Sequence, residues 1–328
     1  MNPSLKTAFL PAGPAAVATA ARVLREGGLV AFPTETVYGL GADAANAAAV
    51  ARLYQAKGRP AFNPLIAHVG DLEAARRIGR FGADARQLAD AFWPGPLTLV
   101  LPKATDCAVA ELATAGLDTV AVRIPADPLA RDILRAFGGA VVAPSANLSG
   151  HVSPTAADHV QADLDGRIDL IVDGGPVTVG VESTIVGCFA APMLLRPGGV
   201  PRAAIERVLG RALAPPPDNA GGGQPLAPGM LASHYAPRTP IRLEADRVAP
   251  GEALLAFGPH SLPGAETTAA ALNLSARGDL AEAAANLFGY LRALDSQQAQ
   301  AIAVMPIPRE GLGEAINDRL RRAAVGRQ

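Results

Sequence analysis

Charged residues are scarce in this chain of 328 residues, at 18% against 49% hydrophobic residues, and the formal net charge is −1. This balance is typical of a globular protein and excludes a strongly cationic chain that wraps nucleic acid, although a local basic concavity remains compatible with it. The two cysteines, Cys107 and Cys188, exclude a disulfide framework and a structural zinc site and fit a reducing cytosol. No run approaches the roughly 20 apolar residues of a membrane span. We therefore expect a cytoplasmic protein that does not enter a membrane.

Lysine is especially rare and occurs only as Lys6, Lys57 and Lys103. Lys57 lies two residues before Arg59, on a loop with a glycine and Pro60 between two apolar segments. An ammonium group and a forked guanidinium this close together suit a phosphate or carboxylate that both can reach. The simpler interpretation is a solvated turn with two surface cations, and the choice depends on the rest of the chain.

Helical and extended patterns alternate from residue 14 to residue 209, which predicts an α/β domain with a twisted mixed sheet and flanking helices. The first helical segment contains Arg22 and Arg25 and ends at Gly27, which is typical of an amphipathic helix and not of a signal peptide. We expect helices at 14–26, 44–54, 72–77, 83–92, 128–137 and 201–209, and strands at 29–33, 65–69, 97–101, 120–124, 140–143, 170–173, 183–186 and 193–196.

The composition changes sharply at residues 214–223, which are rich in proline and end in a run of glycines. Such a segment packs neither as a helix nor as a strand and indicates a linker. A second alternating unit follows and predicts a smaller parallel α/β domain of the Rossmann-like kind. Its strands are expected at 241–243, 253–257 and 301–305, and its helices at 279–294 and 313–324. We therefore divide the chain into a first domain at 1–210, a linker at 211–240 and a C-terminal domain at 241–328.

Three segments rich in hydroxyl groups lie beside predicted strands, at residues 33–41, 144–153 and 182–184. Hydroxyls next to glycines at a strand end suit the recognition of a polar ligand with close backbone approach. Each segment alone also fits an ordinary polar turn, with Glu35 as a solvated acid and either Ser153 or Thr155 as a helix cap.

Arg123 ends a predicted apolar strand, and no acid lies beside it in the sequence. A buried guanidinium needs a partner, which is either an internal acid or a bound one. Arg196 ends the last predicted strand of the first domain in the same way. His68 lies within an apolar strand, where a hydrogen-bonded core histidine is the alternative, and no H-E-x-x-H or paired cysteines support a metal site. Together with Lys57 and Arg59, these residues predict a polar ligand site at the strand ends.

Seven motifs occur in order between residues 32 and 199: F-P-T-E-T-V-Y-G-L-G, K-G-R-P-A-F-N-P-L, W-P-G-P-L-T-L-V-L, V-R-I-P, P-S-A-N-L-S-G, E-S-T-I-V and L-R-P-G. They resemble the successive motifs of the YrdC-like family. Farther on, P-G-M-L-A-S-H-Y-A-P and G-L-G-E-A-I-N-D-R-L-R-R-A-A resemble the linker and C-terminal domain of its long form, the L-threonylcarbamoyladenylate synthases. The resemblance covers nearly the whole chain. One departure is Ala227, which stands where the linker motif usually begins with serine.

The resemblance implies a nucleotidyltransferase that makes threonylcarbamoyl-AMP from L-threonine, bicarbonate and ATP and releases pyrophosphate. The product would supply the threonylcarbamoyl group for the modified adenosine next to the tRNA anticodon, through the downstream threonylcarbamoyl transferase machinery. The resemblance implies a threonine pocket formed by Thr36, His68, Arg123, Ser183 and, through its backbone, Ala143. It implies ATP contacts from Arg59, Asn63, Thr119, Ser145, Ser153, Arg196 and Tyr235. Lys57 and Arg59 are the expected catalytic residues.

These residues suit nucleotidyl transfer, because attack of a carbamate oxygen on the α-phosphate needs alignment and charge neutralisation more than a covalent nucleophile. Mg²⁺ is expected with ATP, held by phosphates and water, since the sequence shows no cage of protein carboxylates. A non-catalytic RNA-binding or ribosome-assembly factor is an alternative, although the few tyrosines argue against an open stacking platform. A carbamoyl transferase is another, but it would be expected to carry acylphosphatase-like or zinc-finger modules upstream. Direct tRNA binding and the oligomeric state stay open.

The linker contains an apolar and aromatic cluster, Met230, His234 and Tyr235, that is unusual for a passive spacer. We expect residues 227–237 to fold across the ligand cleft as a lid, with Tyr235 near the ATP phosphates. A passive tether with incidental surface aromatics is the alternative.

Overall fold

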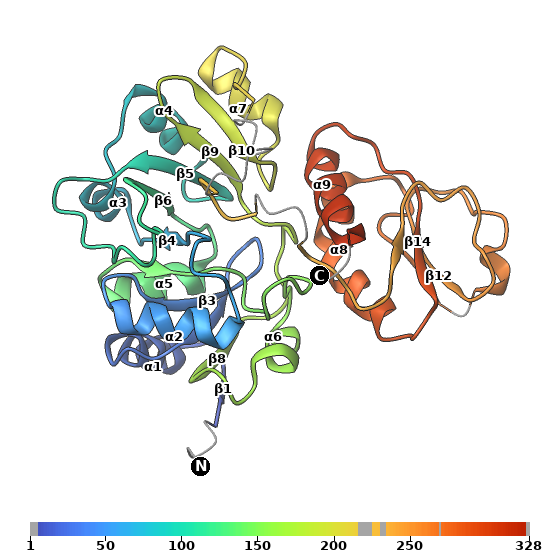
Figure 1. Cartoon of the computed structure of the whole chain (residues 1–328), viewed down its shortest axis with the longest axis horizontal. Helices are drawn as coiled ribbons and strands as arrows, with labels where there is room; N and C mark the ends of the chain where they lie inside the picture. The colour runs from blue at the N-terminus through green and yellow to red at the C-terminus, as the bar shows by residue number, and fades with distance from the viewer. Residues whose placement is uncertain (1–5, 216–224, 230–233, 269, 326–328) are drawn as a thin grey trace.

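The computed structural model describes residues 6–215, 225–229, 234–268 and 270–325. In these ranges the chain folds around two separate β-sheets, one of ten strands and one of four, at the left and right of Figure 1. The predicted α/β class, with a mixed sheet followed by a smaller parallel one, is confirmed. None of the described helices is long and apolar enough to cross a membrane.

The large sheet has the strand order β1-β8-β2-β3-β7-β4-β6-β5-β9-β10 and mixes parallel with antiparallel neighbours. At its centre β4 runs parallel to β6, with His68 opposite Arg123, which brings two expected site residues together. Its strands are β1 (Ala8–Pro11), β2 (Val30–Pro33), β3 (Tyr38–Asp43), β4 (Ile66–His68), β5 (Leu97–Pro102), β6 (Thr119–Arg123), β7 (Val141–Val142), β8 (Leu170–Asp173), β9 (Thr184–Cys188) and β10 (Pro192–Arg196).

The helices of this domain are α1 (Pro14–Arg25), α2 (Ala47–Lys57), α3 (Leu72–Ile78), α4 (Ala83–Phe92), α5 (Pro128–Phe137), α6 (Ala157–Leu164) and α7 (Arg202–Leu209). Short polar side chains begin several of them. Asn46 Oδ1 accepts from the backbone N–H of Ala48 at 3.0 Å, so α2 begins three residues later than its apolar pattern predicted. Asp71 and Asp127 cap α3 and α5 in the same way. Gly58 ends α2 in the left-handed conformation and turns the chain into the following loop.

The two faces of the large sheet are covered differently, and this difference determines where the cleft lies. One face packs against α2, α3, α4, α6 and α7 through a continuous apolar core. On the opposite face, α1 and α5 cover the region of β2, β7 and β8. The rest of that face, formed by β4, β5, β6, β9 and β10, carries a small apolar cluster whose described members include no helical residue. We call this part the helix-free face.

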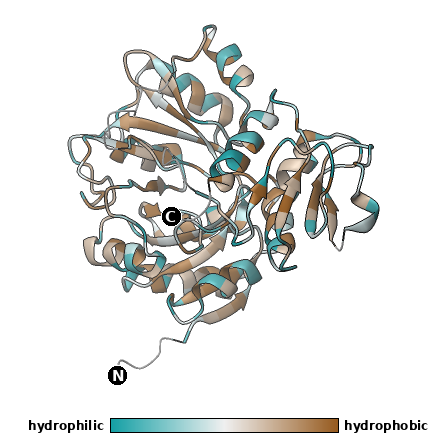
Figure 2. Ribbon diagram, turned by 45° about the vertical axis from the view of Figure 1, so that its right-hand side comes forward, coloured by the Kyte–Doolittle hydropathy of each residue, from teal (hydrophilic) through white to brown (hydrophobic). Residues whose placement is uncertain are grey.

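Three strands were not predicted from the sequence: β1, β3 and, in the smaller sheet, β13 (Ala271–Asn273). The sequence of β3 contains two glycines, which lower its strand propensity and obscure the pattern. Both glycines lie in crowded positions. A Cβ on Gly41 would lie 2.8 Å from Phe32 Cε1 and 3.0 Å from Val141 Cγ1, and a Cβ on Gly39 would lie 3.1 Å from Ala143 Cβ. Figure 2 shows the strands as mainly hydrophobic ribbons between helices of mixed character.

The smaller sheet has the order β11-β14-β12-β13, with all described neighbours parallel. Its remaining elements are β11 (Ile241–Arg242), β12 (Glu252–Ala256), a 3₁₀ turn at Ala265–Thr267, α8 (Leu280–Asp295), β14 (Ala301–Val304) and α9 (Leu312–Ala324). In Figure 1 these two helices lie on the side of the small sheet that faces the larger domain. Their apolar residues form one cluster with Val37, Val152 and Val181 of the first domain and with Tyr235 of the linker. This shared core docks the C-terminal domain beside the cleft.

Candidate active site

A cleft lies over the helix-free face of the large sheet and is bordered by the linker. Ile66 and His68 both reach it from β4, because alternate residues of a strand face the same side. The sequence predicted a site at the strand ends, whereas part of the cleft lies on the face of the sheet. The lining residues are Thr36, Val37, Arg59, Ile66, His68, Arg123, Ala143, Pro144, Ser145, Glu182, Ser183, Arg196, Pro228, Gly229, His234 and Tyr235.

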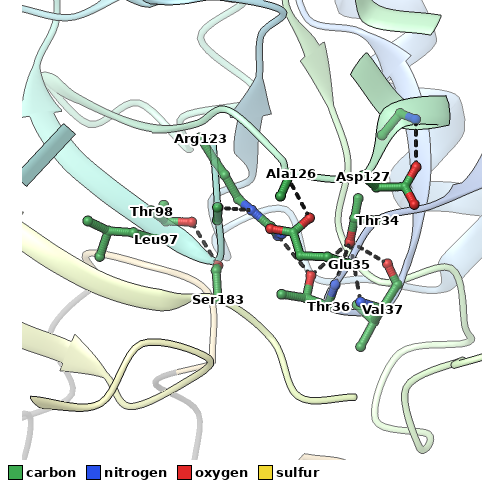
Figure 3. Close-up of polar contacts among 12 residues, drawn as sticks. Thr34, Glu35, Thr36, Val37, Leu97, Thr98, Arg123, Ala126, Asp127 and Ser183 are labelled. Atoms are coloured by element: carbon green, nitrogen blue, oxygen red, sulfur yellow. Dashed lines mark hydrogen bonds and ion pairs between the residues drawn. The ribbon is translucent and has the colours of Figure 1, made fainter. Parts of the chain in front are cut away.

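Arg123 is 3% exposed and is held by the chain itself (Figure 3). Its Nη2 forms an ion pair with Glu35 Oε1 at 2.7 Å, and its Nη1 donates to Thr36 Oγ1 at 2.9 Å. Its Nε donates to the carbonyl of Gly95 at 3.2 Å. Glu35 is therefore a buried partner of Arg123, and the interpretation of Glu35 as a solvated acid is wrong. The result is a guanidinium in a fixed orientation with a threonine hydroxyl beside it.

His68 presents a neutral imidazole to the cleft. Burial, with a smaller contribution from the positive charge of Arg123, lowers the pKa of His68 to about 3. The ring is therefore uncharged at pH 7. Its Nδ1 lies 3.2 Å from the carbonyl oxygen of Ile66, which favours the tautomer in which Nδ1 donates and Nε2 accepts. His68 thus offers a ligand a hydrogen-bond acceptor close to the cation of Arg123.

Ser183, which directly precedes β9, contacts side chains of the two neighbouring strands, β5 and β10. Its Oγ lies 2.7 Å from Thr98 Oγ1, as Figure 3 shows, and 3.2 Å from Arg196 Nη2. Arg196 Nη2 also donates to the Ser183 carbonyl at 3.0 Å. Because Ser183 is only 1% exposed, these contacts fix the direction of its hydroxyl.

Two guanidiniums at the cleft, those of Arg59 and Arg196, form no ion pair with a carboxylate in the described part of the chain. Arg59 donates to the backbone carbonyls of Asn63 at 3.3 Å and Pro64 at 3.0 Å, while Arg196 donates to Ser183. Burial lowers the pKa of Arg59 to about 10, so it remains protonated at pH 7. Burying such charges is costly without an anion, so the pair indicates a ligand with several negative charges.

Lys57 and Arg59 are buried, at 2% and 9% exposure, so their interpretation as surface cations is wrong. Lys57 Nζ donates to the backbone carbonyls of Ser145 and Asn147, both at 2.5 Å. Burial, and then the charge of Arg59, holds the pKa of Lys57 well below its ordinary value. Lys57 does not line the cleft and instead supports the loop that brings Ser145 to it.

Lys57→Ala is expected to lower the free energy of unfolding by about 2 kcal/mol, because it leaves two shielded carbonyls without their donor. Denaturant unfolding measures this loss. Lys6→Ala, at an exposed position, is the matched control and should stay within about 0.5 kcal/mol of the unmodified protein. A Lys57→Ala protein of unchanged stability would show that the lysine does not support the loop.

The cleft brings together nine of the thirteen expected site residues. These are Thr36, His68, Arg123, Ala143 and Ser183, expected for threonine, and Arg59, Ser145, Arg196 and Tyr235, expected for ATP. Lys57, Asn63, Thr119 and Ser153 do not line it. Thr119 is half-buried at the other end of β6 from Arg123, and Ser153 donates to Glu182 Oε1 at 2.6 Å. A contact of these four residues with a ligand remains a prediction.

Four lining residues were not expected at the site: Val37, Ile66, Pro144 and Glu182. Three more, Pro228, Gly229 and His234, belong to the segment 227–237 that was expected to fold across the cleft. Glu182 had a signal in the sequence, since it precedes Ser183 in a polar segment, but its partners could not be seen there. Gly229 has a φ of 85°, and an added Cβ would lie 2.7 Å from Arg196 Cδ. A glycine is therefore required where the linker passes over this cation.

The described parts of the linker pack tightly beside the cleft. Tyr235 is 1% exposed, and its ring centroid lies 5.5 Å from that of Phe288 and 4.0 Å from that of His234. Ala227 joins the apolar cluster of the helix-free face. Tyr235 is therefore not an incidental surface aromatic. Residues 230–233, including Met230 of the expected cluster, lie outside the described residues.

Two family models cover almost all of this architecture. The Sua5/YciO/YrdC model, described as telomere recombination, matches residues 22–198. The chain belongs to the Sua5/YciO/YrdC family. The model described as threonylcarbamoyl-AMP synthase, C-terminal domain, matches residues 200–325 and so includes α7 and the linker together with the small sheet. The resemblance to a two-domain YrdC-like protein is confirmed.

Relatives in the Sua5/YciO/YrdC family match over nearly their full length. The threonylcarbamoyl-AMP synthase of Bacillus subtilis is 43% identical over 324 residues, which cover 95% of this chain and 93% of the relative. That of Pyrococcus abyssi is 41% identical over 324 residues, covering 93% of each. The crystal structure of P. abyssi Sua5 complexed with L-threonine matches with a TM-score of 0.87 at 39% identity and covers 97% of both chains.

Proposed function

We infer that this protein synthesises threonylcarbamoyl-AMP from L-threonine, bicarbonate and ATP and releases pyrophosphate. The observation that carries this inference is a single cleft whose arginines have two different environments. Arg123 is fixed beside the hydroxyl of Thr36, and Arg59 and Arg196 lack carboxylate partners in the described residues. The B. subtilis and P. abyssi relatives, both named threonylcarbamoyl-AMP synthase, and the P. abyssi Sua5 complex with L-threonine support it.

Threonine is proposed to bind at Arg123. Its Nε and Nη1 donate one hydrogen each, to Gly95 and Thr36, while Nη2 forms only an ion pair with Glu35, so each Nη retains an N–H for a carboxylate. The neutral Nε2 of His68 can accept from an ammonium or hydroxyl group of the same ligand. A small zwitterionic amino acid therefore suits this end of the cleft.

The triphosphate is proposed to bind at Arg59 and Arg196. The carbamate formed from threonine and bicarbonate would attack the α-phosphate. An O–P bond forms, and the bond to the pyrophosphate oxygen breaks. The two guanidiniums lie in a buried site, where they stabilise charge on the transferring and leaving phosphates more strongly than in water. The loop supported by Lys57 would hold Ser145 against the nucleotide.

Mg²⁺ is proposed to enter with ATP and to be held by phosphates and water. The carboxylate that lines the cleft, Glu182, is already occupied by Arg319 and Ser153, and Glu35 beside the cleft is occupied by Arg123. In the described ranges, no cluster of three or more His, Cys, Asp or Glu residues is arranged to hold a metal ion. Mg²⁺ would neutralise phosphate charge, while the arginines orient the chain of phosphates.

The product is proposed to pass to the tRNA threonylcarbamoyl transferase machinery in the cytoplasm, where ATP, threonine and tRNA occur together. The RNA-binding alternative expects cations displayed on the surface, whereas Arg59, Arg123 and Arg196 are all buried. The direct test measures pyrophosphate release from ATP with purified protein. Release that requires both threonine and bicarbonate supports the proposal, and ATP turnover independent of threonine contradicts it.

Arg59→Ala is expected to reduce threonine-dependent pyrophosphate release roughly 100-fold, because it removes a buried cation from the leaving phosphates. Arg59→Lys should recover part of the rate, since the charge remains while the fork is lost. Arg86→Ala, at an exposed position on α4, is the control and should have the unmodified rate. Full activity of a folded Arg59→Ala protein would exclude Arg59 from the reaction.

A further inference from the structure

The most deeply buried charge of the described chain comes from the C-terminal domain. Arg319 of α9 has no exposed surface and is the largest of the fully buried side chains. Its Nε donates to Glu182 Oε2 at 2.7 Å, across 137 residues of sequence, and its Nη1 donates to Asp318 Oδ2 at 2.7 Å. Arg319 therefore reaches from one domain to a residue that lines the cleft of the other.

Glu182 is held from two directions. While Arg319 occupies Oε2, Oε1 accepts from the hydroxyl of Ser153 at 2.6 Å. The guanidinium carbon of Arg319 also lies 5.2 Å from the ring centroid of Tyr235. One cation thus contacts a cleft residue of the first domain and a cleft residue of the linker.

We propose that Arg319 is a positioning residue of the active site, which holds Glu182 against Ser153 and so keeps it from forming an ion pair with the phosphate-binding cation Arg196. This role rests on the proposed function, because it assigns Arg196 to the triphosphate. It also gives the C-terminal domain a direct part in the reaction.

The electrostatics of Glu182 explain why a restraint is needed. Burial alone would raise the pKa of this carboxyl, but Arg319 and then Arg196, with hydrogen bonds from Ser153 and Arg319, lower it to about 2. The side chain is therefore an anion at pH 7, close to the cation proposed for ATP. Without Arg319, the carboxylate would be left to pair with Arg196 and would compete with the phosphates for it.

A second interdomain ion pair separates this role from simple docking. Arg202 of α7 contacts Glu314 of α9, with Nη2 and Oε1 2.6 Å apart. This pair joins the same helix to the same domain, but its side chains are 38% and 30% exposed and do not line the cleft. A substitution at Glu314 therefore perturbs docking without changing the charges around Glu182.

The test compares Arg319→Met, Arg319→Lys, Glu182→Gln and the double variant Arg319→Met/Glu182→Gln with Glu314→Gln, in the full chain. Arg319→Met is expected to raise the KM for ATP roughly 10- to 100-fold. The released Glu182 would pair with Arg196, and the charge-assisted contact of Arg196 to the phosphates would be lost. The KM for threonine should change less than about twofold, which is less than the loss of even one weak hydrogen bond would cause. Glu314→Gln should have the unmodified values.

The double variant provides the decisive comparison. If Arg319 acts by restraining Glu182, removing both charges should return the KM for ATP toward its unmodified value. A merely structural loss of Arg319 would leave the KM of the double variant as high as that of Arg319→Met. The proposal would be overturned if the KM for ATP rose equally in Arg319→Met and in the double variant. An unchanged KM for ATP in folded Arg319→Met would overturn it as well. Should Arg319→Met fail to fold, Arg319→Lys makes the same comparison, because a single ammonium cannot hold Glu182 and Asp318 together.

The pH dependence of the KM for ATP gives an independent test. The charged and titratable groups around Glu182 are Arg319 and Asp318 from α9, Arg196 from β10, and His234 and Tyr235 from the linker. Loss of Arg319 removes a cation that lowers the pKa of Glu182, so in Arg319→Met this carboxyl should become protonated at higher pH than in the unmodified protein. Because the neutral carboxyl does not compete for Arg196, the raised KM for ATP of Arg319→Met should fall again as the pH is lowered through that range, and the double variant should lack this fall. A KM of Arg319→Met that follows the same pH dependence as that of the double variant would contradict the proposal. Absence of any threonine-dependent activity in the unmodified protein would instead refute the proposed function.

Discussion

Arg123→Ala is expected to weaken threonine binding about 10- to 150-fold, because it removes the charge-assisted partner proposed for the amino-acid carboxylate. The structure adds a second effect that the sequence did not reveal. Glu35 loses its ion pair while it remains 8% exposed, and an uncompensated buried charge costs about 3–5 kcal/mol of stability. Isothermal calorimetry and denaturant unfolding measure the two effects separately.

The double variant Arg123→Met/Glu35→Gln separates ligand binding from stability. It removes both members of the buried ion pair, so much of the stability should return. Threonine binding should stay weak, since no guanidinium faces the carboxylate. ATP binding should change less than threonine binding in every variant. Equal losses for the two ligands, or restored threonine binding in the double variant, would contradict the assignment of Arg123.

Ending the chain after Pro215 is expected to reduce product formation at least about 100-fold. This is on the order of the rate lost when one group that stabilises the transition state electrostatically is removed. The cut removes Tyr235 and Arg319 and leaves the helix-free face open to water, which promotes hydrolysis of a labile acyl-adenylate. The shortened protein should still fold, since every strand of the large sheet is retained. A cut after Leu209 is less suitable, because Leu213 belongs to the core and Ala214 bridges to Met193.

Milder changes test the same closure without removing a domain. Tyr235→Phe keeps the ring packed on Phe288 and should reduce the rate less than the truncation does, if its hydroxyl contacts the phosphates. Bound ATP and threonine should also slow proteolysis of the linker in the full chain. Linker proteolysis that saturating ligands leave unchanged, together with full activity of the shortened protein, would reduce residues 211–240 to a tether.

Much of the local structure followed from the sequence. The helix at 83–92, the helix at 128–137 and the strand at 170–173 have the expected bounds. The two helices have a clear apolar period, and the strand is a short apolar run that ends at an aspartate before two glycines. The strand β3 was not predicted, because its glycines allow close packing between neighbouring strands and a local sequence pattern does not show such packing. The hydroxyls and cations clustered in motifs predicted a shared polar site, and nine of the expected site residues line one cleft.

The sequence by itself determined the α/β class, the two sheets separated by a proline- and glycine-rich linker, and the family to which the chain belongs. Only the tertiary structure decided which charges meet. It pairs Arg123 with Glu35 across 88 residues, buries Lys57 beneath a loop, and brings Arg319 of the second domain to Glu182 of the first. The physical reason is that a buried charge must find its partner in space, and the partner's distance along the chain leaves no mark on the local pattern.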